Sequence, residues 1–191
     1  MATQFNITQF RTKLKNGGAR PNQFSISIQP PGGLPGGFLP QLAENSAFLV
    51  SVGELPGQTI GVAPVYYRGR EIKLAGDKVF APFTCTVLND TDMSIRDSME
   101  RWMNYIEGNV NKGIAGLVGE TSPANYMGTI LVDQLDRQGK SIRSYKLFDA
   151  FPVDISPVGL DFAANDQMST FSITFQYQYF TINGATGAIA L

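Results

Sequence analysis

The stretch that decides the fold covers residues 169–180, STFSITFQYQYF, and alternates between apolar and polar side chains. One side of it carries Phe171, Ile173, Phe175, Tyr177 and Tyr179. The other side carries Ser172, Thr174, Gln176 and Gln178. A period of two is typical of a β-strand with one buried face. The pattern therefore predicts a long strand that packs on a core with one face and presents a polar, uncharged surface with the other.

The composition indicates one domain over residues 1–191 with an unusually uncharged surface. Apolar residues make up 43% of the chain, which is enough for a core, whereas charged residues make up only 16%. A typical domain has about 25% charged residues. We interpret the shortfall as surface covered by further copies of the chain; a plain polar surface rich in Ser, Thr, Asn and Gln is the alternative. The net charge of −1 gives no indication of binding to nucleic acid or membranes.

The residue counts argue against an enzyme. The chain has no histidine and one cysteine, Cys85, so the histidine-based catalytic sets and the usual zinc sites are excluded. Pairs of aspartates fall at expected strand ends or turns, where Asp commonly caps or bonds the backbone; they are Asp90 with Asp92, Asp133 with Asp136, and Asp161 with Asp166. We expect no catalytic residue, no metal and no cofactor. Neither a signal peptide nor an apolar run long enough for a membrane anchor is expected.

Turn signals and alternating segments organise the remaining chain into short strands. A hairpin is expected over residues 65–74 with Arg68-Gly69 at its tip, and a second one around residues 136–139. Cys85 is expected in the core. Further strands are expected over residues 22–28, 47–52, 79–88, 126–135 and 140–148. The segments between and outside them are an N-terminal arm over residues 1–21, a Pro/Gly-rich loop over 30–46 and a C-terminal tail over 182–191.

One helix is expected from Ser94 to Glu107, with Ser94 as its N-cap and Asp97 in its first turn. Its apolar stripe consists of Ile95, Met99, Trp102, Met103 and Ile106, at helical spacing. The simplest interpretation is a helix that lies on a sheet with a solvated outer face; contact of its charged face with a partner is the alternative. The fold class is therefore mainly antiparallel β, sandwich-like or barrel-like, with one flanking helix.

Several stretches, taken in order, resemble the tail tube proteins of contractile-tailed, T4-like bacteriophages. The resemblance covers most of residues 19–182, and its middle block is the most specific part. The stretches are ARPNQF at residues 19–24, YRGREIKLAGDKVF at 67–80, TCTVLND at 84–90, ERWMN at 100–104 and TFSITF at 170–175.

The resemblance implies a structural protein of the virion, assembled in the host cytoplasm. In this family six subunits form a ring, their sheets merge into a continuous inner β-barrel, and the rings stack into a hollow tube for DNA inside a contractile sheath. The implied partners are other copies of the chain, the sheath protein, the baseplate and tail-terminator proteins, and the tape measure protein and DNA in the lumen. Closure into a shared barrel also removes exposed sheet edges.

The resemblance assigns roles to the two faces of the expected strands. Residues expected to line a water-filled lumen are Thr84, Thr86, Ser172, Thr174, Gln176 and Gln178. Residues expected on the outer, sheath-side face of the helix are Arg96, Glu100, Arg101 and Glu107. In the Pro/Gly-rich loop, which looks longer than is usual for the family, Leu34, Phe38 and Leu39 are expected to contact other subunits or rings. The C-terminal tail also looks extended.

Three alternatives remain open at the level of the sequence. Two keep the fold: a baseplate protein that initiates the tube, and a tube subunit of a headless contractile injection device. The third belongs to another class, a β-sandwich module that binds a ligand such as a carbohydrate. Such a module needs an exposed aromatic platform, whereas the aromatic residues here fall mainly in alternating strands and in the helix stripe, where a core position is simpler.

Overall fold

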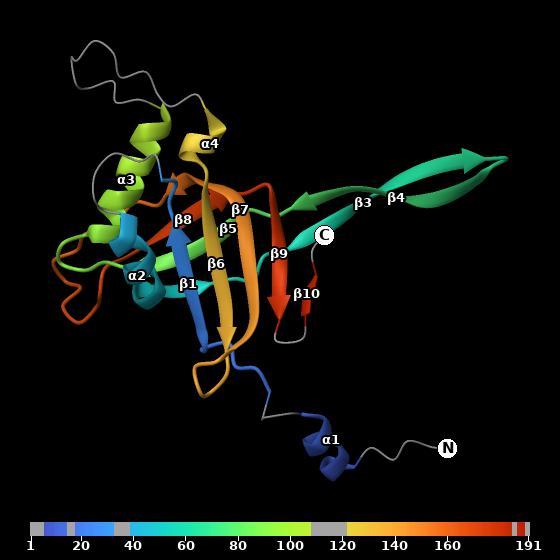
Figure 1. Cartoon of the computed structure of the whole chain (residues 1–191), viewed down its shortest axis with the longest axis horizontal. Coiled ribbons are helices and arrows are strands. Elements are labelled where there is room, and N and C mark those ends of the chain that lie inside the picture. Colours follow the sequence, from blue (N-terminus) through green and yellow to red (C-terminus); the bar gives the residue numbers. More distant parts are fainter. Residues whose placement is uncertain (1–5, 15–17, 33–38, 108–121, 185–186, 190–191) are drawn as a thin grey trace.

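The computed structural model describes residues 6–14, 18–32, 39–107, 122–184 and 187–189. Almost half of these residues lie in antiparallel strands, and two of the helices pack on them (Figure 1). The predicted mainly antiparallel β class is confirmed. The strands do not close on themselves within one chain, because the hydrogen-bonded order runs as an open path from β1 to β2. None of the helices in the described part of the chain has the length and hydropathy needed to cross a membrane.

The strands form two layers that share the long strand β7 (Ser141–Ile155). In the first layer, β7 pairs through its N-terminal part with β6 (Gly128–Leu135) on one side and β9 (Tyr179–Gly184) on the other. β1 (Phe24–Gln29) pairs with the far side of β6. In the second layer, the C-terminal part of β7 pairs with β8 (Thr170–Gln176), which pairs with β5 (Phe83–Leu88), and β5 pairs with β2 (Val50–Gly53).

The strand expected over residues 169–180 is divided by a bend where the chain passes from one layer to the other. β8 ends at Gln176 and β9 begins at Tyr179. At this point Asp149 of β7 has a positive φ of 55°, and the Gln178 N–H donates to the Phe148 carbonyl at 3.1 Å. The alternation slips by one residue across the bend, as in a β-bulge. The expectation that Tyr179 faces the core is therefore wrong, and Phe180 is buried in its place.

The core lies between the two layers and under α3 (Ser94–Glu107), which confirms the predicted helix. Trp102 has no exposed surface; its Nε1–H donates to the Tyr126 carbonyl at 2.8 Å, and its ring centroid lies 6.2 Å from that of Phe175. Tyr126 belongs to the short helix α4 (Pro123–Tyr126). Gly128 follows, where a Cβ would come within 2.8 Å of the Trp102 ring and 2.5 Å of the Gln29 carbonyl oxygen. Only glycine allows this close approach.

A second helix, α2 (Leu39–Leu49), occupies part of the segment expected as loop 30–46 and the first half of the strand expected over 47–52; the second half lies in β2. It lies along the outer edge of β1. The Ile28 N–H donates to Ser46 Oγ at 3.0 Å, and Ser27 Oγ donates to the Ala43 carbonyl at 3.2 Å. The helix thus satisfies backbone groups that β1 would otherwise leave open, a recurrent way of covering a sheet edge.

The hairpin expected over residues 65–74 is confirmed but is much longer. β3 (Gln58–Tyr67) and β4 (Arg70–Phe80) pair with each other and extend away from both layers (Figure 1). Arg68 and Gly69 at the tip have φ values of 48° and 79°, as a two-residue type I′ turn requires. The strand expected over residues 79–88 is interrupted at Ala81-Pro82, because β4 ends at Phe80 and β5 starts at Phe83. Proline cannot donate a ladder hydrogen bond.

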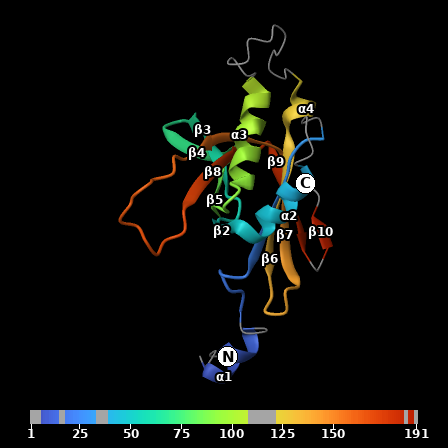
Figure 2. The same cartoon turned by 90° about the vertical axis from the view of Figure 1, so that its left-hand side faces the viewer.

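The ends of the described chain are also more regular than expected. The N-terminal arm contains α1 (Ile7–Lys13), whose Thr8 N–H donates to the Asn6 side chain at 3.1 Å. The expected C-terminal tail begins inside β9, and a further strand, β10 (Gly187–Ile189), pairs back on β9. Residues 156–169, between β7 and β8, form an irregular loop that projects from the body (orange in Figure 2).

Candidate functional site

Four of the six residues expected to line a lumen lie together on the outer surface of the second layer. Thr84 faces Thr174 and Thr86 faces Ser172 across β5 and β8. The side-chain oxygens of each pair lie 3.2 Å apart, so the hydroxyls bond to one another. Cross-strand hydroxyl pairs of this kind stabilise antiparallel sheets. We call this surface, Thr84, Thr86, Ser172 and Thr174, the polar face.

The opposite side of the same two strands is buried and apolar. Phe83, Cys85, Ile173 and Phe175 alternate with the polar face and have at most 2% of their surface exposed. The expectation that Cys85 lies in the core is confirmed, and burial raises the pKa of its thiol to about 12. Because Trp102 of α3 packs on Phe175, α3 and the polar face lie on opposite sides of the second layer.

The register brings two further residues to the polar face. Asp154 of β7 is the partner of Thr174, and Val52 of β2 is the partner of Thr86; both side chains are exposed. Sequence analysis missed them, because no local pattern states which strands are neighbours. The face therefore carries one carboxylate and one apolar side chain beside its hydroxyls.

The two glutamines in the expected set lie at the margin of this surface. Gln176 is the last residue of β8, is exposed and pairs with Phe151 of β7. Gln178 lies in the bend between β8 and β9, so it is exposed but does not continue the row of hydroxyls. The bend, not the alternation in sequence, decides its position.

The charged side of α3 is only partly an outer face. Glu100, Arg101 and Glu107 are exposed, and Arg101 pairs with Asp97 at 2.9 Å. Arg96 turns back towards the sheet.

Arg96 makes three contacts, of which those to Ser156 and Phe171 hold it in this inward position. Its Nε–H donates to Glu100 at 2.8 Å, a second N–H donates to the Ser156 carbonyl at 3.3 Å, and its guanidinium lies 5.4 Å from the centroid of the Phe171 ring. These contacts within the subunit do not favour the assignment of Arg96 to an outward contact surface, which stays a prediction. Its guanidinium attaches α3 to the second layer.

The contact residues predicted in the Pro/Gly-rich loop are placed only in part. Leu34 and Phe38 lie outside the described residues. Leu39 is the first residue of α2, and its side chain is not described. Their role in contacts between subunits stays a prediction.

Most of these aspartates lie in turns, loops or a cap, but Asp133 lies within β6, near its end. Asp90 accepts hydrogen bonds from the backbone N–H and hydroxyl of Ser94, which hold the pKa of its carboxyl below the ordinary value. Asp133 accepts hydrogen bonds from Ser141 and Ser144, and Asp161 accepts one from the Ala163 N–H. In the described ranges no three His, Cys, Asp or Glu residues are grouped closely enough to hold a metal ion.

The β3–β4 hairpin is a surface that sequence analysis did not single out. Its apolar side chains are exposed on both faces of the ribbon, although an isolated hairpin of this kind has little stability in water. On one face the exposed chains are Val65, Tyr67, Ile72, Leu74 and Val79; on the other they are Ile60, Val62 and Tyr66. The signal available in the sequence is the apolar content of residues 60–67. In the structure, the tip of the hairpin lies too far from any other strand for these side chains to be buried.

The second layer also ends in free strand edges on both sides. β2 is the last strand of the path, and β7 pairs with β6 only as far as Ala150, so residues 151–155 bond on one side only among the described residues. The layer has four strands, and neighbours within it are antiparallel. A second copy's β2 placed beside residues 151–155 would therefore also be antiparallel.

Comparison with known sequences gives a consistent result. A family model described as phage tail tube protein matches residues 19–183. The tail tube protein gp19 of Enterobacteria phage T4 is 27% identical over 84% of this chain and 90% of its own length. The tail tube protein of Serratia phage KSP90 is 24% identical over 90% of this chain and 93% of its own length.

Comparison with solved structures shows the same fold. A chain of the anti-feeding prophage baseplate, solved with 6-fold symmetry, aligns over 88% of this chain and 97% of its own length with a TM-score of 0.60. A chain of the sheath–tube complex of an extracellular contractile injection system aligns over 95% of this chain and all of its own length with a TM-score of 0.54. Both are 13% identical to this chain, so the likeness concerns the fold alone.

Proposed function

Because the chain belongs to the phage tail tube protein family and is a structural component of the virion, we propose that six copies close into a ring through the second layer, and that stacked rings form a conduit for DNA. A tail tube subunit has no catalytic task, and the assignment to this family displaces the ligand-binding module considered from the sequence. The observation that carries the proposal is the layer with a polar outer face and two unpaired edges.

Pairing of β2 in one copy with residues 151–155 of β7 in the next is a heterologous contact. Such contacts either close into rings or continue as open filaments. With four strands from each copy, every junction is antiparallel and the ring becomes a barrel without free edges. The 6-fold symmetry of the anti-feeding prophage assembly supports the ring size.

The chemistry of the polar face suits a passage for DNA. Hydroxyl groups keep the wall wet, and Asp154 beside them repels phosphate. Lysine or arginine at these positions would bind the DNA backbone and oppose its movement. We therefore assign the polar face to the lumen. Gln176 lies at its margin.

The placement of the polar face puts α3 on the outside of the ring. Glu100, Arg101 and Glu107 are then the residues available to a contractile sheath. Structures of related fold come from a sheath–tube complex and from a sheath/tube terminator. Sheath, terminator and baseplate proteins are accordingly the partners we propose, with the tape measure protein and DNA in the lumen.

The test is electron microscopy of the purified chain with light scattering on the same sample. The expected result is six-fold rings or hollow tubes, with a mass far above the 20.8 kDa of one chain. A chain that remains monomeric at high concentration, and that also fails to extend preformed tubes, contradicts the proposal. A chain that extends preformed tubes but forms none alone indicates a subunit that needs a template; one that only starts tubes of another protein indicates the baseplate initiator.

A further inference from the structure

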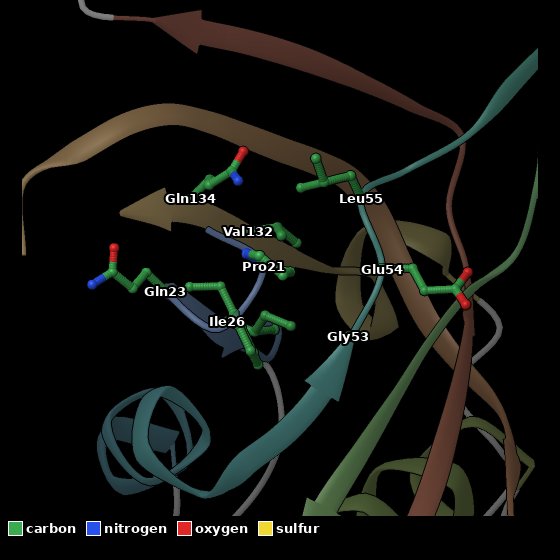
Figure 3. Close-up of a pocket in the computed structure, with 9 residues that line it drawn as sticks. Pro21, Gln23, Ile26, Gly53, Glu54, Leu55, Val132 and Gln134 are labelled. Carbon is green, nitrogen blue, oxygen red and sulfur yellow. The ribbon is translucent and has the colours of Figure 1, made fainter. Parts of the chain in front are cut away.

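A pocket lies in the seam between the two end strands of the sheet, β1 and β2 (Figure 3). α2 covers one part of the edge of β1 through the bond from the Ile28 N–H to Ser46 Oγ. The pocket lies at the opposite end of β1, where Phe24 and Ile26 line it together with the chain that follows β2 at Gly53. The seam is thus closed at one end by the protein's own helix and open at the other.

The pocket has the size and the chemistry for one phenol ring. Its volume is about 170 Å³, and its walls include Phe24, Ile26, Leu55 and Val132. An apolar cavity of about 150 Å³ accepts a benzene molecule. Gln23 and Gln134 also line it, and Figure 3 shows the Gln134 amide directed towards Leu55 and the Gln23 amide on the opposite side of the pocket. Amide groups in the wall can satisfy a hydroxyl, which buried tyrosine requires and a leucine or phenylalanine does not.

The tip of the β3–β4 hairpin carries an exposed tyrosine whose phenol ring matches this pocket. Tyr67 is 62% exposed and stands at the end of the apolar face that Val65 and Ile72 continue. The guanidinium of Arg68 lies 5.5 Å from the centroid of its ring. The tip points away from the molecule that carries it (Figure 1), so it is available to a second copy.

The charges at the tip and at the pocket are complementary. Glu54 is the charged residue among those that line the pocket, and Figure 3 shows its carboxylate directed away from the other lining side chains. The tip carries Arg68 and Arg70 on either side of Gly69.

Two other segments were considered as occupants of the pocket. α1 also carries apolar and basic residues. The irregular loop over residues 156–169 carries exposed Leu160 and Phe162 beside Asp161, whose charge would repel Glu54.

The backbone of the tip adds a separate observation. Arg68 has a φ of 48°, in the left-handed region, at a turn position where Asn, Asp or Gly is usual. An arginine there opposes the local backbone preference, and within the hairpin its side chain lies over the Tyr67 ring. Strained positions of this kind recur where a side chain serves a contact.

We propose that the pocket between β1 and β2 receives the hairpin tip of another copy of this chain, with the Tyr67 ring inside and Arg68 paired with Glu54 at the rim. The inference rests on the proposed function, since it concerns contacts between copies in the assembled tube. It is separate from the edge pairing that closes the ring. One projecting tip and one pocket per copy make this contact heterologous, so it can be repeated without limit along a tube.

The experiment compares the concentration needed for assembly, by pelleting and electron microscopy, for wild type and five variants, four single and one double. Tyr67→Ser is expected to raise this concentration about tenfold or more, as for loss of about 1.4 kcal/mol. Tyr66→Ser is the matched control, because Tyr66 is the adjacent tyrosine, is even more exposed than Tyr67 and lies on the other face of the hairpin. Arg68→Asn places a preferred residue in the turn and is expected to weaken assembly without loss of thermal stability.

The fourth variant reverses the charge at the rim. Glu54→Arg is expected to weaken assembly to a similar degree, and the double variant Glu54→Arg, Arg68→Glu to recover most of it. Recovery by the second charge reversal distinguishes a direct contact from a general effect on the surface.

A cross-link tests proximity independently of assembly. Mixing Tyr67→Cys chains with Gln134→Cys chains under mild oxidation is expected to give disulfide-linked pairs, whereas Tyr66→Cys with Gln134→Cys gives far fewer. The native Cys85 is buried, with its thiol pKa raised to about 12, and does not compete. A Phe10→Cys chain that cross-links to Gln134→Cys instead would assign the pocket to α1 and overturn the inference.

The outcomes separate the two proposals. Tubes that form normally in Tyr67→Ser and Glu54→Arg, without the cross-link, overturn the inference and leave the proposed function intact. If wild-type chains form no tubes and extend none, the proposed function is contradicted. If Tyr67→Cys and Gln134→Cys chains at high concentration then also give no cross-link, the inference is overturned as well.

Discussion

At the scale of single residues, the start of α3 depends on Asp90 more than on the expected N-cap. Ser94 is the first residue of the helix, and its N–H and hydroxyl donate to the Asp90 carboxylate at 2.9 and 2.7 Å. An anionic acceptor at this end satisfies a free N–H group and also interacts favourably with the helix dipole. The side chain four residues before the helix therefore takes the role that the sequence pattern suggested for Ser94.

We expect Asp90→Ala to lower the free energy of unfolding by about 1 kcal/mol, the usual cost of losing a helix cap. Asp92→Ala is the control, since Asp92 is exposed and lies in the same turn. The fluorescence of Trp102, the single tryptophan, reports unfolding of the core during urea denaturation. Equal loss in both variants would show that the turn, and not the cap, is responsible.

The same carboxylate predicts a dependence on pH. Hydrogen bonds from Ser94 lower the pKa of Asp90 below its ordinary value of 3.8. A depressed pKa means that the stabilisation is fully present above pH 3.8 and is lost as the pH falls through the pKa of the folded state. The stability difference between wild type and Asp90→Ala should therefore shrink on acidification; a difference that stays constant to the lowest pH at which the protein folds contradicts this.

At the scale of elements, the β3–β4 hairpin is the part of the chain least explained by the isolated subunit. It exposes apolar side chains on both faces, and a two-stranded ribbon gains little stability in water. Exposed apolar surface of this extent marks a contact with a partner. The hairpin therefore depends on the assembly for burial of these side chains.

Shortening the hairpin should separate folding from assembly. In the proposed variant Asn-Gly replaces residues 63–74 and joins Val62 to Ala75, which are already partners in the ladder. Asn-Gly is the preferred type I′ turn. Because the removed side chains are exposed, the melting temperature should change by less than about 4 °C, the shift expected for 1 kcal/mol in a chain of this size. Tubes should be absent by electron microscopy. Normal tubes from this variant would show that the hairpin is dispensable.

α2 shows why element type could not be predicted everywhere. Its residues, Leu39–Leu49, include Pro40, Asn45 and Ser46, which favour turns and caps over helix interiors. The helix is held by contacts with a distant segment, above all the bond from the Ile28 N–H to Ser46 Oγ. Local propensity is a weak prior that tertiary contacts of this kind override.

At the scale of the whole molecule, the decisive feature is that α3 and the polar face lie on opposite sides of one layer. A ring built from this layer has one of these surfaces inside and the other outside. Our proposal places the hydroxyl groups inside. A charge added to each surface can distinguish the two arrangements.

We expect tubes of Thr84→Lys to retain short labelled DNA at low salt, because each ring then carries lysines in its bore. Glu107→Lys is the control, since it adds positive charge to the exposed end of α3. Retention is measured by gel filtration of tubes loaded with DNA, and it should fall steeply as salt rises. If Glu107→Lys retains as much DNA inside intact tubes as Thr84→Lys does, the assignment of the polar face to the lumen is wrong.

Alternation, turn residues and helical spacing were enough to predict the antiparallel class, the Arg68-Gly69 tip and α3, because these features depend on neighbours within a few residues. Thr84 and Thr86 were grouped with Ser172 and Thr174 only through the resemblance to a known family. The tertiary structure decided what depends on distant segments. Its contacts turned Arg96 inward onto Phe171, shifted the alternation at Tyr179, folded α2 against β1 and left the pocket between β1 and β2 open. The physical reason is that strand order and bends are set by the packing of two layers, which no single stretch of sequence contains.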